Sequence, residues 1–115
     1  MKPASPEQVS RYADMFAAMG AASRLRIVQL LLASHPEGMV AGEIQAELGV
    51  SASNLSHHLE KLRNEGLVAV EREGTFLRHR ANAEALRELL AFLYSECCTR
   101  SKAVSPRKII GISAG

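Results

Sequence analysis

Residues 41–66 of the chain read AGEIQAELGVSASNLSHHLEKLRNEG. The stretch holds two apolar patterns with helical spacing, one over 41–48 and one that starts after Ser51 and runs to about Asn64. Residues 49–51 make a tight turn between them, and the Ser51 hydroxyl can cap the second helix. Gly66 then stops that helix in the C′ position. We therefore predict two short helices joined by a turn, the framework of a helix-turn-helix.

The flanking sequence completes this unit on both sides. On the N-terminal side, Ser5, Pro6 and Gln8 form a capping pattern for a helix that Gly20 ends. Ser23 is expected to cap a second helix, which is apolar on most sides and so should be central to the core. After Gly66 the apolar period changes from 3.6 to 2, which predicts two strands around the turn at residues 71–75.

A last helix is expected from a cap at Asn82 to about Cys97 or Cys98. The predicted order is ααααββα, mainly α with a small β-hairpin (α+β), which is a winged helix-turn-helix. We expect one domain over residues 1–98. Residues 99–115 are rich in Ser, Lys, Arg, Pro and Gly, and we expect a flexible tail there.

Composition limits the possible classes of function. The 115 residues are 47% hydrophobic and 23% charged, with a net charge of +2 that neither requires nor forbids a nucleic-acid partner. No apolar run suits a membrane span, and the start lacks the apolar stretch of a signal peptide, so we expect a cytoplasmic protein without a membrane partner. The four His are not at metal spacing with carboxylates, and we expect no enzyme.

The second helix of a helix-turn-helix enters the major groove of DNA, where its N-terminal residues contact base edges. Its outward side chains here are short and polar, which suits hydrogen bonding to bases, whereas Lys61 suits the phosphate backbone. Arg72, beside the hairpin turn, is the favoured wing contact. The predicted DNA-binding residues are Ser51, Ser53, Asn54, Ser56, His57, Lys61 and Arg72.

Other interpretations of these residues stay open. The polar helix face could be an ordinary solvated face, and the hairpin could merely close the sheet. The second helix of the helix-turn-helix has a predicted buried stripe of Leu55, Leu59 and Leu62. His58 lies beside this leucine stripe and is either a half-buried packing residue or part of the reading face. Arg78 and Arg80 lie further from the hairpin turn. For each of them, DNA contact and a structural role are equally open.

Two stretches resemble the ArsR/SmtB family of bacterial metalloregulatory repressors. They are residues 20–27, GAASRLRI, and residues 53–59, SNLSHHL, followed by Leu62 and the run from Glu65 to Val68. The wing sequence 72–74 also fits, and the likeness covers about residues 8–98. The resemblance implies a homodimer formed by the first and last helices, a palindromic operator as partner, and release from DNA when an inducer binds.

The resemblance also directs attention to inducer sites. The helix at 41–48 has no cysteine, and the last helix has no His, so we expect no zinc. The run LAFLYSECC over residues 90–98 resembles an arsenic-responsive group whose ligand is trivalent arsenic or antimony. Many members of that group have a third cysteine a few residues later, and this chain has none.

Cys97 and Cys98 are the only cysteines, and soft thiophilic ions select thiolates. A vicinal pair is a complete site for a monomethyl arsenical and two-thirds of one for arsenite or antimonite. Neighbouring side chains on a helix point about 100° apart, so both sulfurs reach one ion only if the helix end unwinds. Two alternatives are a buried structural pair at the dimer interface and a redox-responsive pair. We expect a repressor released by trivalent arsenic or antimony, with a redox-responsive or non-metal-responsive repressor as the alternative.

Overall fold

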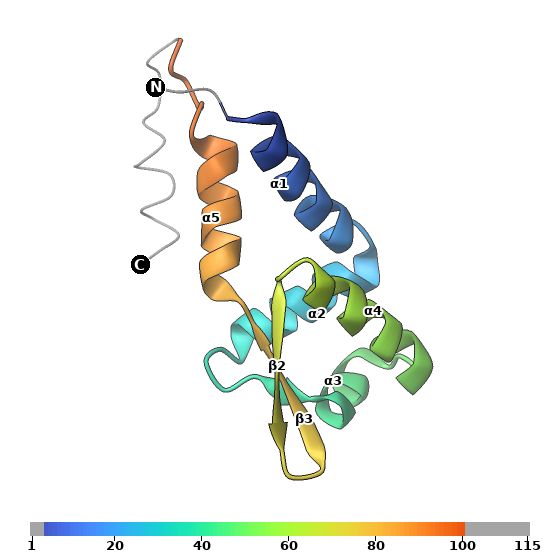
Figure 1. Ribbon diagram of the computed structural model, residues 1–115. Coiled ribbons are helices and arrows are strands. Elements are labelled where there is room, and N and C mark those ends of the chain that lie inside the picture. Colours follow the sequence, from blue (N-terminus) through green and yellow to red (C-terminus); the bar gives the residue numbers. More distant parts are fainter. Residues whose placement is uncertain (1–3, 101–115) are drawn as a thin grey trace. The chain divides into compact units, whose positions relative to one another are not determined.

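The computed structural model describes residues 4–100, and these form two compact units, residues 4–83 and 84–100. The expected tail is therefore mostly outside the described residues. The first unit contains four helices and three strands within its described part (Figure 1). They are α1 (Pro6–Met19), α2 (Ala22–Ala33), β1 (Met39–Val40), α3 (Ala41–Leu48), α4 (Ala52–Asn64), β2 (Val68–Glu73) and β3 (Phe76–Ala81). The winged helix-turn-helix prediction is confirmed, with a short strand added.

The first two helices begin differently. At α1 the predicted capping box is present, because the Ser5 hydroxyl accepts from the Gln8 amide and the Gln8 side chain accepts from the Ser5 amide. The predicted Ser23 cap is wrong: α2 begins at Ala22, its N-cap is Ala21, and no side chain caps it. An apolar face of α2 packs inward through Ile27, Val28 and Leu31, and this burial stabilises the helix without a cap.

The helix-turn-helix itself follows the prediction closely. Gly49 ends α3 with φ 65°, a left-handed conformation that glycine adopts without strain. The Ser51 hydroxyl accepts from the Asn54 amide at 3.1 Å and so caps α4. At the other end, the Leu67 amide donates to the Leu62 carbonyl at 3.0 Å, which closes the helix with Gly66 at C′.

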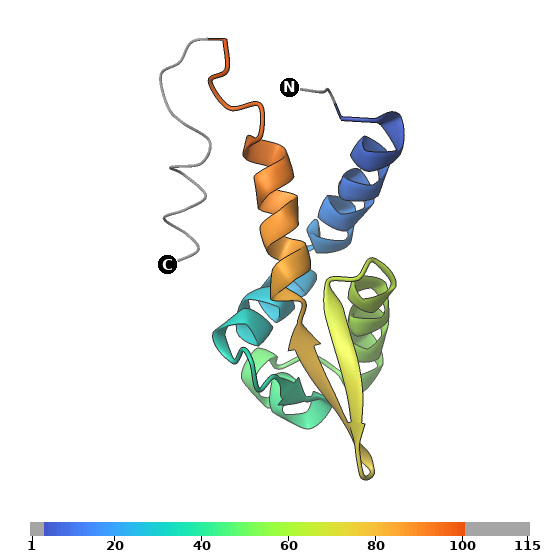
Figure 2. The same ribbon diagram turned by 60° about the vertical axis from the view of Figure 1, so that its left-hand side comes forward.

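The sheet is antiparallel in the order β1-β3-β2, and the β2–β3 hairpin extends beyond the helices of this unit in both views (Figures 1 and 2). The two-residue strand β1 is absent from the predicted order. It is too short to have a period of its own and exists because Met39 and Val40 pair with His79 and Arg78 of β3. Gly38 leads into it with φ 75°, and a Cβ there would lie 2.2 Å from the His79 carbonyl oxygen.

The core of the first unit is formed by the buried side chains on one face of its helices and strands. From α4 it takes the predicted leucine stripe, with Leu55, Leu59 and Leu62 at most 6% exposed. Its other large, fully buried side chains are Met15, Ile27, Leu31, Ile44 and Leu67. These contacts fix the angle of α4 relative to α2 and α3, and thereby decide which of its residues face solvent.

The second unit contains α5 (Ala83–Tyr94), whose first residue belongs to the first unit. The helix ends three residues before Cys97, earlier than predicted. Both the amide and the hydroxyl of Ser95 donate to the Phe92 carbonyl, so i to i−3 bonds replace the α-helical pattern. The chain then turns, with the Cys97 amide donating to the Tyr94 carbonyl.

No single helix in the described part of the chain is long and apolar enough to cross a membrane. Within residues 4–100, α1 and α2 taken together reach that length and apolar character, and a bend of 95° separates them.

Candidate nucleic-acid interface and cysteine site

The predicted reading residues of α4 and its N-cap are all exposed: Ser51, Ser53, Asn54, Ser56, His57 and Lys61. At about 100° per residue, Ser53 and His57 lie opposite the buried leucines, and the rest spread to either side. Ser56 lies toward the hairpin, where it lines a groove, and Lys61 lies toward α1, where it lines a second cavity with Asp14 and Arg24. The structure thus brings the predicted helix residues together on one solvent-facing surface.

Glu60 belongs to the same surface and was missed by the sequence analysis. It is exposed and lies about 20° around the helix from Ser53. A carboxylate here repels phosphate but can accept a hydrogen bond from the amino group of cytosine. Counting outward positions by angle, rather than selecting neutral polar residues, would have found it.

The hairpin has two chemically different faces. The register pairs Val68 with Ala81, Val70 with His79, and Arg72 with Leu77, so these six side chains share one face of the sheet. Near the helices this face is buried, and toward the tip it carries Arg72, which is exposed. Within residues 4–100, the Arg72 side chain makes no hydrogen bond or ion pair.

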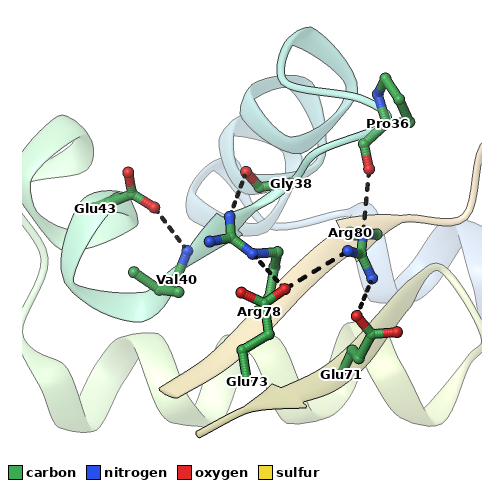
Figure 3. Close-up of polar contacts among 8 residues, drawn as sticks. All are labelled: Pro36, Gly38, Val40, Glu43, Glu71, Glu73, Arg78 and Arg80. Carbon is green, nitrogen blue, oxygen red and sulfur yellow. Dashed lines mark hydrogen bonds and ion pairs between the residues drawn. The ribbon is translucent and has the colours of Figure 1, made fainter. Parts of the chain in front are cut away.

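The opposite face holds the other two arginines in internal contacts (Figure 3). Arg78 Nε donates to Glu73 Oε2 at 2.8 Å, and its Nη1 donates to the Gly38 carbonyl at 3.4 Å. The hydrogen bond to Glu73 raises the pKa of Arg78. Arg80 contacts Glu71 at 3.1 Å and donates from Nε to the Pro36 carbonyl. These contacts favour the structural interpretation of both residues over DNA contact.

A groove of about 440 Å³ lies between α3, α4 and the hairpin. Its lining includes apolar residues such as Val70 and Leu77, and polar residues such as Ser56 and Arg63. His79 also lines it, is 6% exposed, and its Nδ1 has no hydrogen-bond partner in the described structure. Burial lowers the pKa of His79, because the charged imidazolium would lose its hydration. Sequence analysis missed this residue, since one histidine in a strand gives no signal.

His58 is half-buried and takes part in a contact between helices. Its Nδ1 lies 3.3 Å from Nη1 of Arg24, and Arg24 Nε donates to the Ala18 carbonyl of α1. The pKa of His58 is lowered, first by desolvation and then by the charge of Arg24, with smaller effects from His57 and Lys61. His58 therefore serves packing between α4 and α2, the first of the two roles that the sequence left open.

The second unit contains the cysteine pair. Both residues are half-buried thiols, and their Sγ atoms lie 3.0 Å apart. They converge because α5 has already ended and Cys98 adopts φ 60°, so the spacing of 100° on a regular helix no longer applies. The hydrogen bond to Cys98 raises the pKa of the Cys97 thiol. Among the described residues, no group of three or more His, Cys, Asp or Glu is arranged to hold a metal ion.

A capped recognition helix, a preceding short helix and a projecting hairpin define a winged helix-turn-helix DNA-binding protein. Comparison with known proteins agrees: a helix-turn-helix domain family model matches residues 19–71. The HTH-type transcriptional regulator YgaV of Escherichia coli is 35% identical over 95 residues, covering 83% of this chain and 91% of YgaV.

Two solved structures share the fold. An ArsR-like transcriptional regulator from a Rhodococcus species has a TM-score of 0.63 at 24% identity and covers 94% of each chain. The homodimeric winged helix-turn-helix DNA-binding domain of Mb0332 from Mycobacterium bovis also has a TM-score of 0.63, at 23% identity, covering 90% of this chain and 94% of that domain. The chain belongs to the helix-turn-helix-type transcriptional regulators, which are not enzymes, and it shares the fold of an ArsR-like regulator.

Proposed function

We propose that the chain is a homodimeric repressor that leaves its operator when trivalent arsenic or antimony binds Cys97 and Cys98. The observation that carries this proposal is the 3.0 Å separation of the two sulfur atoms. Two thiols at that separation can bind one ion after a small rotation of either side chain. The helix end has already unwound, so capture does not first have to break α5.

The raised pKa of the Cys97 thiol favours a trivalent arsenical over a simple divalent cation. The raised pKa of Cys97 keeps that thiol protonated at neutral pH. Zinc requires deprotonated sulfur and usually four protein ligands in a structural site. Methylarsenite carries two hydroxyl groups on arsenic. Each As–S bond forms as one thiol proton leaves with one hydroxyl as water, so two thiols complete the site without a net change in charge.

Arsenite and antimonite have room for a third sulfur. The chain contains only two cysteines, so a third thiolate has to come from the partner subunit, or a hydroxide stays on the ion. The proposal therefore ranks methylarsenite as the ligand that needs only one subunit. If the site instead spans two subunits, arsenite and methylarsenite should be equally effective.

The DNA-reading part of the proposal assigns base contacts to Ser53, Asn54, Ser56 and His57, and backbone contacts to Ser51, Lys61 and Arg72. The support is their exposure and the capped N-terminus of α4, where free amide groups and the helix dipole favour a phosphate. Arg72 shares a sheet face with the residues that pack on the helices, so its charge is presented on the helix side of the wing.

The homodimer is supported by apolar surface on both helices that the family resemblance assigns to the interface. On α1, the apolar side chains of Val9 and Phe16 are 50% and 38% exposed. On α5, Leu90 and Leu93 are 43% and 56% exposed. The Mb0332 domain with the same fold is homodimeric. Large exposed apolar side chains in both helices are typical of an association surface.

The test is a titration of reduced protein, bound to a fluorescent operator duplex, with methylarsenite, arsenite, antimonite, zinc and peroxide, read by anisotropy. We expect release near one equivalent of methylarsenite per subunit. The Cys97→Ser/Cys98→Ser variant should bind the operator as tightly as wild type and stay bound in methylarsenite. A Glu96→Gln variant, altered at an exposed side chain next to the pair but retaining both thiols, is the matched control and should still be released.

Other outcomes would assign a different function. Normal release of the double cysteine variant by arsenicals would exclude the cysteine site. Release by peroxide alone, with no response to arsenicals, would indicate a redox-responsive repressor. No release by any of the five compounds would leave a repressor that does not respond to metals.

A further inference from the structure

We propose that His58 is a positioning residue for DNA recognition: as a neutral acceptor for Arg24 it holds α4 in its reading orientation, and its protonation releases the helix. The inference rests on the proposed DNA-reading role of α4 and is independent of the cysteine site. It concerns one contact, from Arg24 Nη1 to His58 Nδ1 at 3.3 Å.

The chemistry of the two groups fixes which state of His58 makes the contact. A guanidinium has five N–H donors and no acceptor, so Nδ1 of His58 has to supply a lone pair. That requires the neutral ring with its proton on Nε2. A protonated His58 would present an N–H toward a cation, which turns the contact from attraction into repulsion.

Arg24 is anchored on its other side, so the contact fixes α4 relative to two helices. Its Nε donates to the carbonyl of Ala18, in the last turn of α1, and the guanidinium is part-buried. Arg24 therefore joins the end of α1, the start of α2 and the middle of α4. His58 is next in sequence to His57, which we place on the DNA-reading surface. A rotation of α4 that follows loss of this contact would move Ser53, Asn54 and His57 together.

The charged surroundings of His58 favour its neutral form. Arg24 faces it from α2, and His57 and Lys61 are its neighbours on α4. Asp14 of α1 and Glu65 after α4 line the adjoining cavity of about 330 Å³ with Arg24 and Lys61, and they are the nearby acidic groups. Burial and the three basic neighbours lower the pKa of His58, so the contact is intact at neutral pH and fails in acid.

DNA adds an opposing effect that the experiment must separate. Phosphates attract any added positive charge, so protonated His57 or His58 strengthens binding to every sequence. Loss of positioning weakens binding to the operator alone. The informative quantity is therefore the ratio of the dissociation constant for a scrambled duplex to that for the operator duplex. It should be measured by anisotropy from pH 5 to pH 8, with the operator selected from random duplexes by wild-type protein.

For wild type we expect the ratio to fall about five- to tenfold between pH 8 and pH 5, which corresponds to the net contribution of one ordinary hydrogen bond. His58→Gln retains an acceptor that does not titrate, so its ratio should be close to wild type at pH 8 and nearly flat with pH. Arg24→Gln should have a low ratio at every pH. The matched controls are Arg26→Gln and His35→Gln, which alter exposed residues outside the DNA-reading surface and should keep the wild-type slope.

Two results would overturn the inference. One is a pH dependence of the ratio that persists unchanged in His58→Gln. The other needs no variant: a two-bond ¹H–¹⁵N spectrum of the histidine rings at pH 7.5 should show His58 with its proton on Nε2, and a proton on Nδ1 would exclude the contact. An Asn54→Ala variant separates this inference from its premise, because an unchanged ratio there would mean that α4 does not read bases.

Discussion

Arg78 lies across the hairpin from Glu73, with its Nε 2.8 Å from Oε2 of that carboxylate, on the face of the wing opposite to Arg72. The contact divides the wing arginines by function, because one cation is paired within the protein and the other is available to DNA. We predict that Arg72→Ala weakens binding to all duplexes and reduces the slope of log Kd against log salt by about one. Arg78→Ala, the matched control, should leave that slope nearly unchanged and lower stability to urea. Equal slope changes would contradict the division.

Base reading and backbone binding should also separate along α4. Asn54 is exposed in the first turn of the helix, whereas Lys61 lies two turns later. We predict that Asn54→Ala costs about 1–3 kcal/mol on the operator and little on a scrambled duplex. Lys61→Ala should weaken both by a similar factor. Competition anisotropy with both duplexes measures the two effects, and a uniform loss in Asn54→Ala would move that residue to the backbone class.

Two glycines offer a test of how β1 is placed. Gly38 has φ 75°, and a Cβ there would lie 2.2 Å from the His79 carbonyl oxygen, whereas nothing lies within 4 Å of one at Gly42 in α3. Gly38→Ala should destabilise the protein by more than about 2 kcal/mol, because strain and overlap add. Gly42→Ala, at an exposed helical position, should stabilise it by up to about 1 kcal/mol. Urea unfolding of the two variants measures both changes in stability. A Gly38→Ala variant that is as stable as wild type would mean that the loop shifts freely.

The homodimer can be tested on α1. Phe16 is 38% exposed, and Arg11 is an exposed residue about 140° away around the same helix. A glutamate at position 16 would place a charge in the proposed apolar interface, so Phe16→Glu should give a monomer with normal helix content and weak operator binding. Arg11→Glu should remain dimeric. Analytical ultracentrifugation measures the difference, and a dimeric Phe16→Glu would move the interface away from this face.

Local signals explain why so much of the fold could be predicted. The Ser51 cap, the leucine stripe of α4 and the capping box of α1 each depend on residues spaced three or four positions apart, and each is present. Contacts between distant residues left no such signal. The strand β1 exists only through its pairing with β3, and Arg24 and His58 are 34 residues apart. Ser23 has the right side chain for a cap, but packing started α2 one residue before it.

The same distinction between local signals and contacts of distant residues explains which site residues could be predicted. The exposed positions of α4 follow from helical period, so the reading surface could be predicted except for Glu60. Cys97 and Cys98 come together because α5 ends at Tyr94, earlier than the apolar pattern predicts. The Ser95 hydroxyl donates to the Phe92 carbonyl, and this bond accompanies the early end of the helix. Arg78 and Arg80 could not be assigned from sequence, because their partners include carbonyls of Gly38 and Pro36 more than 35 residues away.

The buried ring of His79 should make the stability of the fold sensitive to acid. Burial lowers its pKa in the folded protein below the value of about 6.5 of an unfolded chain, so the unfolded state binds the proton more readily. Stability should therefore be highest above pH 6.5 and fall as the pH drops below it toward the folded-state pKa. His58, with a pKa lowered in the same direction, adds to that loss.

His79→Leu removes the titrating group and the unsatisfied Nδ1 while keeping an apolar side chain against the groove. We expect stability at pH 7.5 to change little or to rise, since an apolar group of similar size replaces a buried polar atom without a partner. The loss of stability between pH 7.5 and pH 5 should become smaller than in wild type. The control is His57→Gln, which alters an exposed residue next to His58, the other histidine with a lowered pKa. This variant should lose as much stability between pH 7.5 and pH 5 as wild type. Urea unfolding at the two pH values gives both differences, and an acid loss that is undiminished in His79→Leu would assign it to other groups.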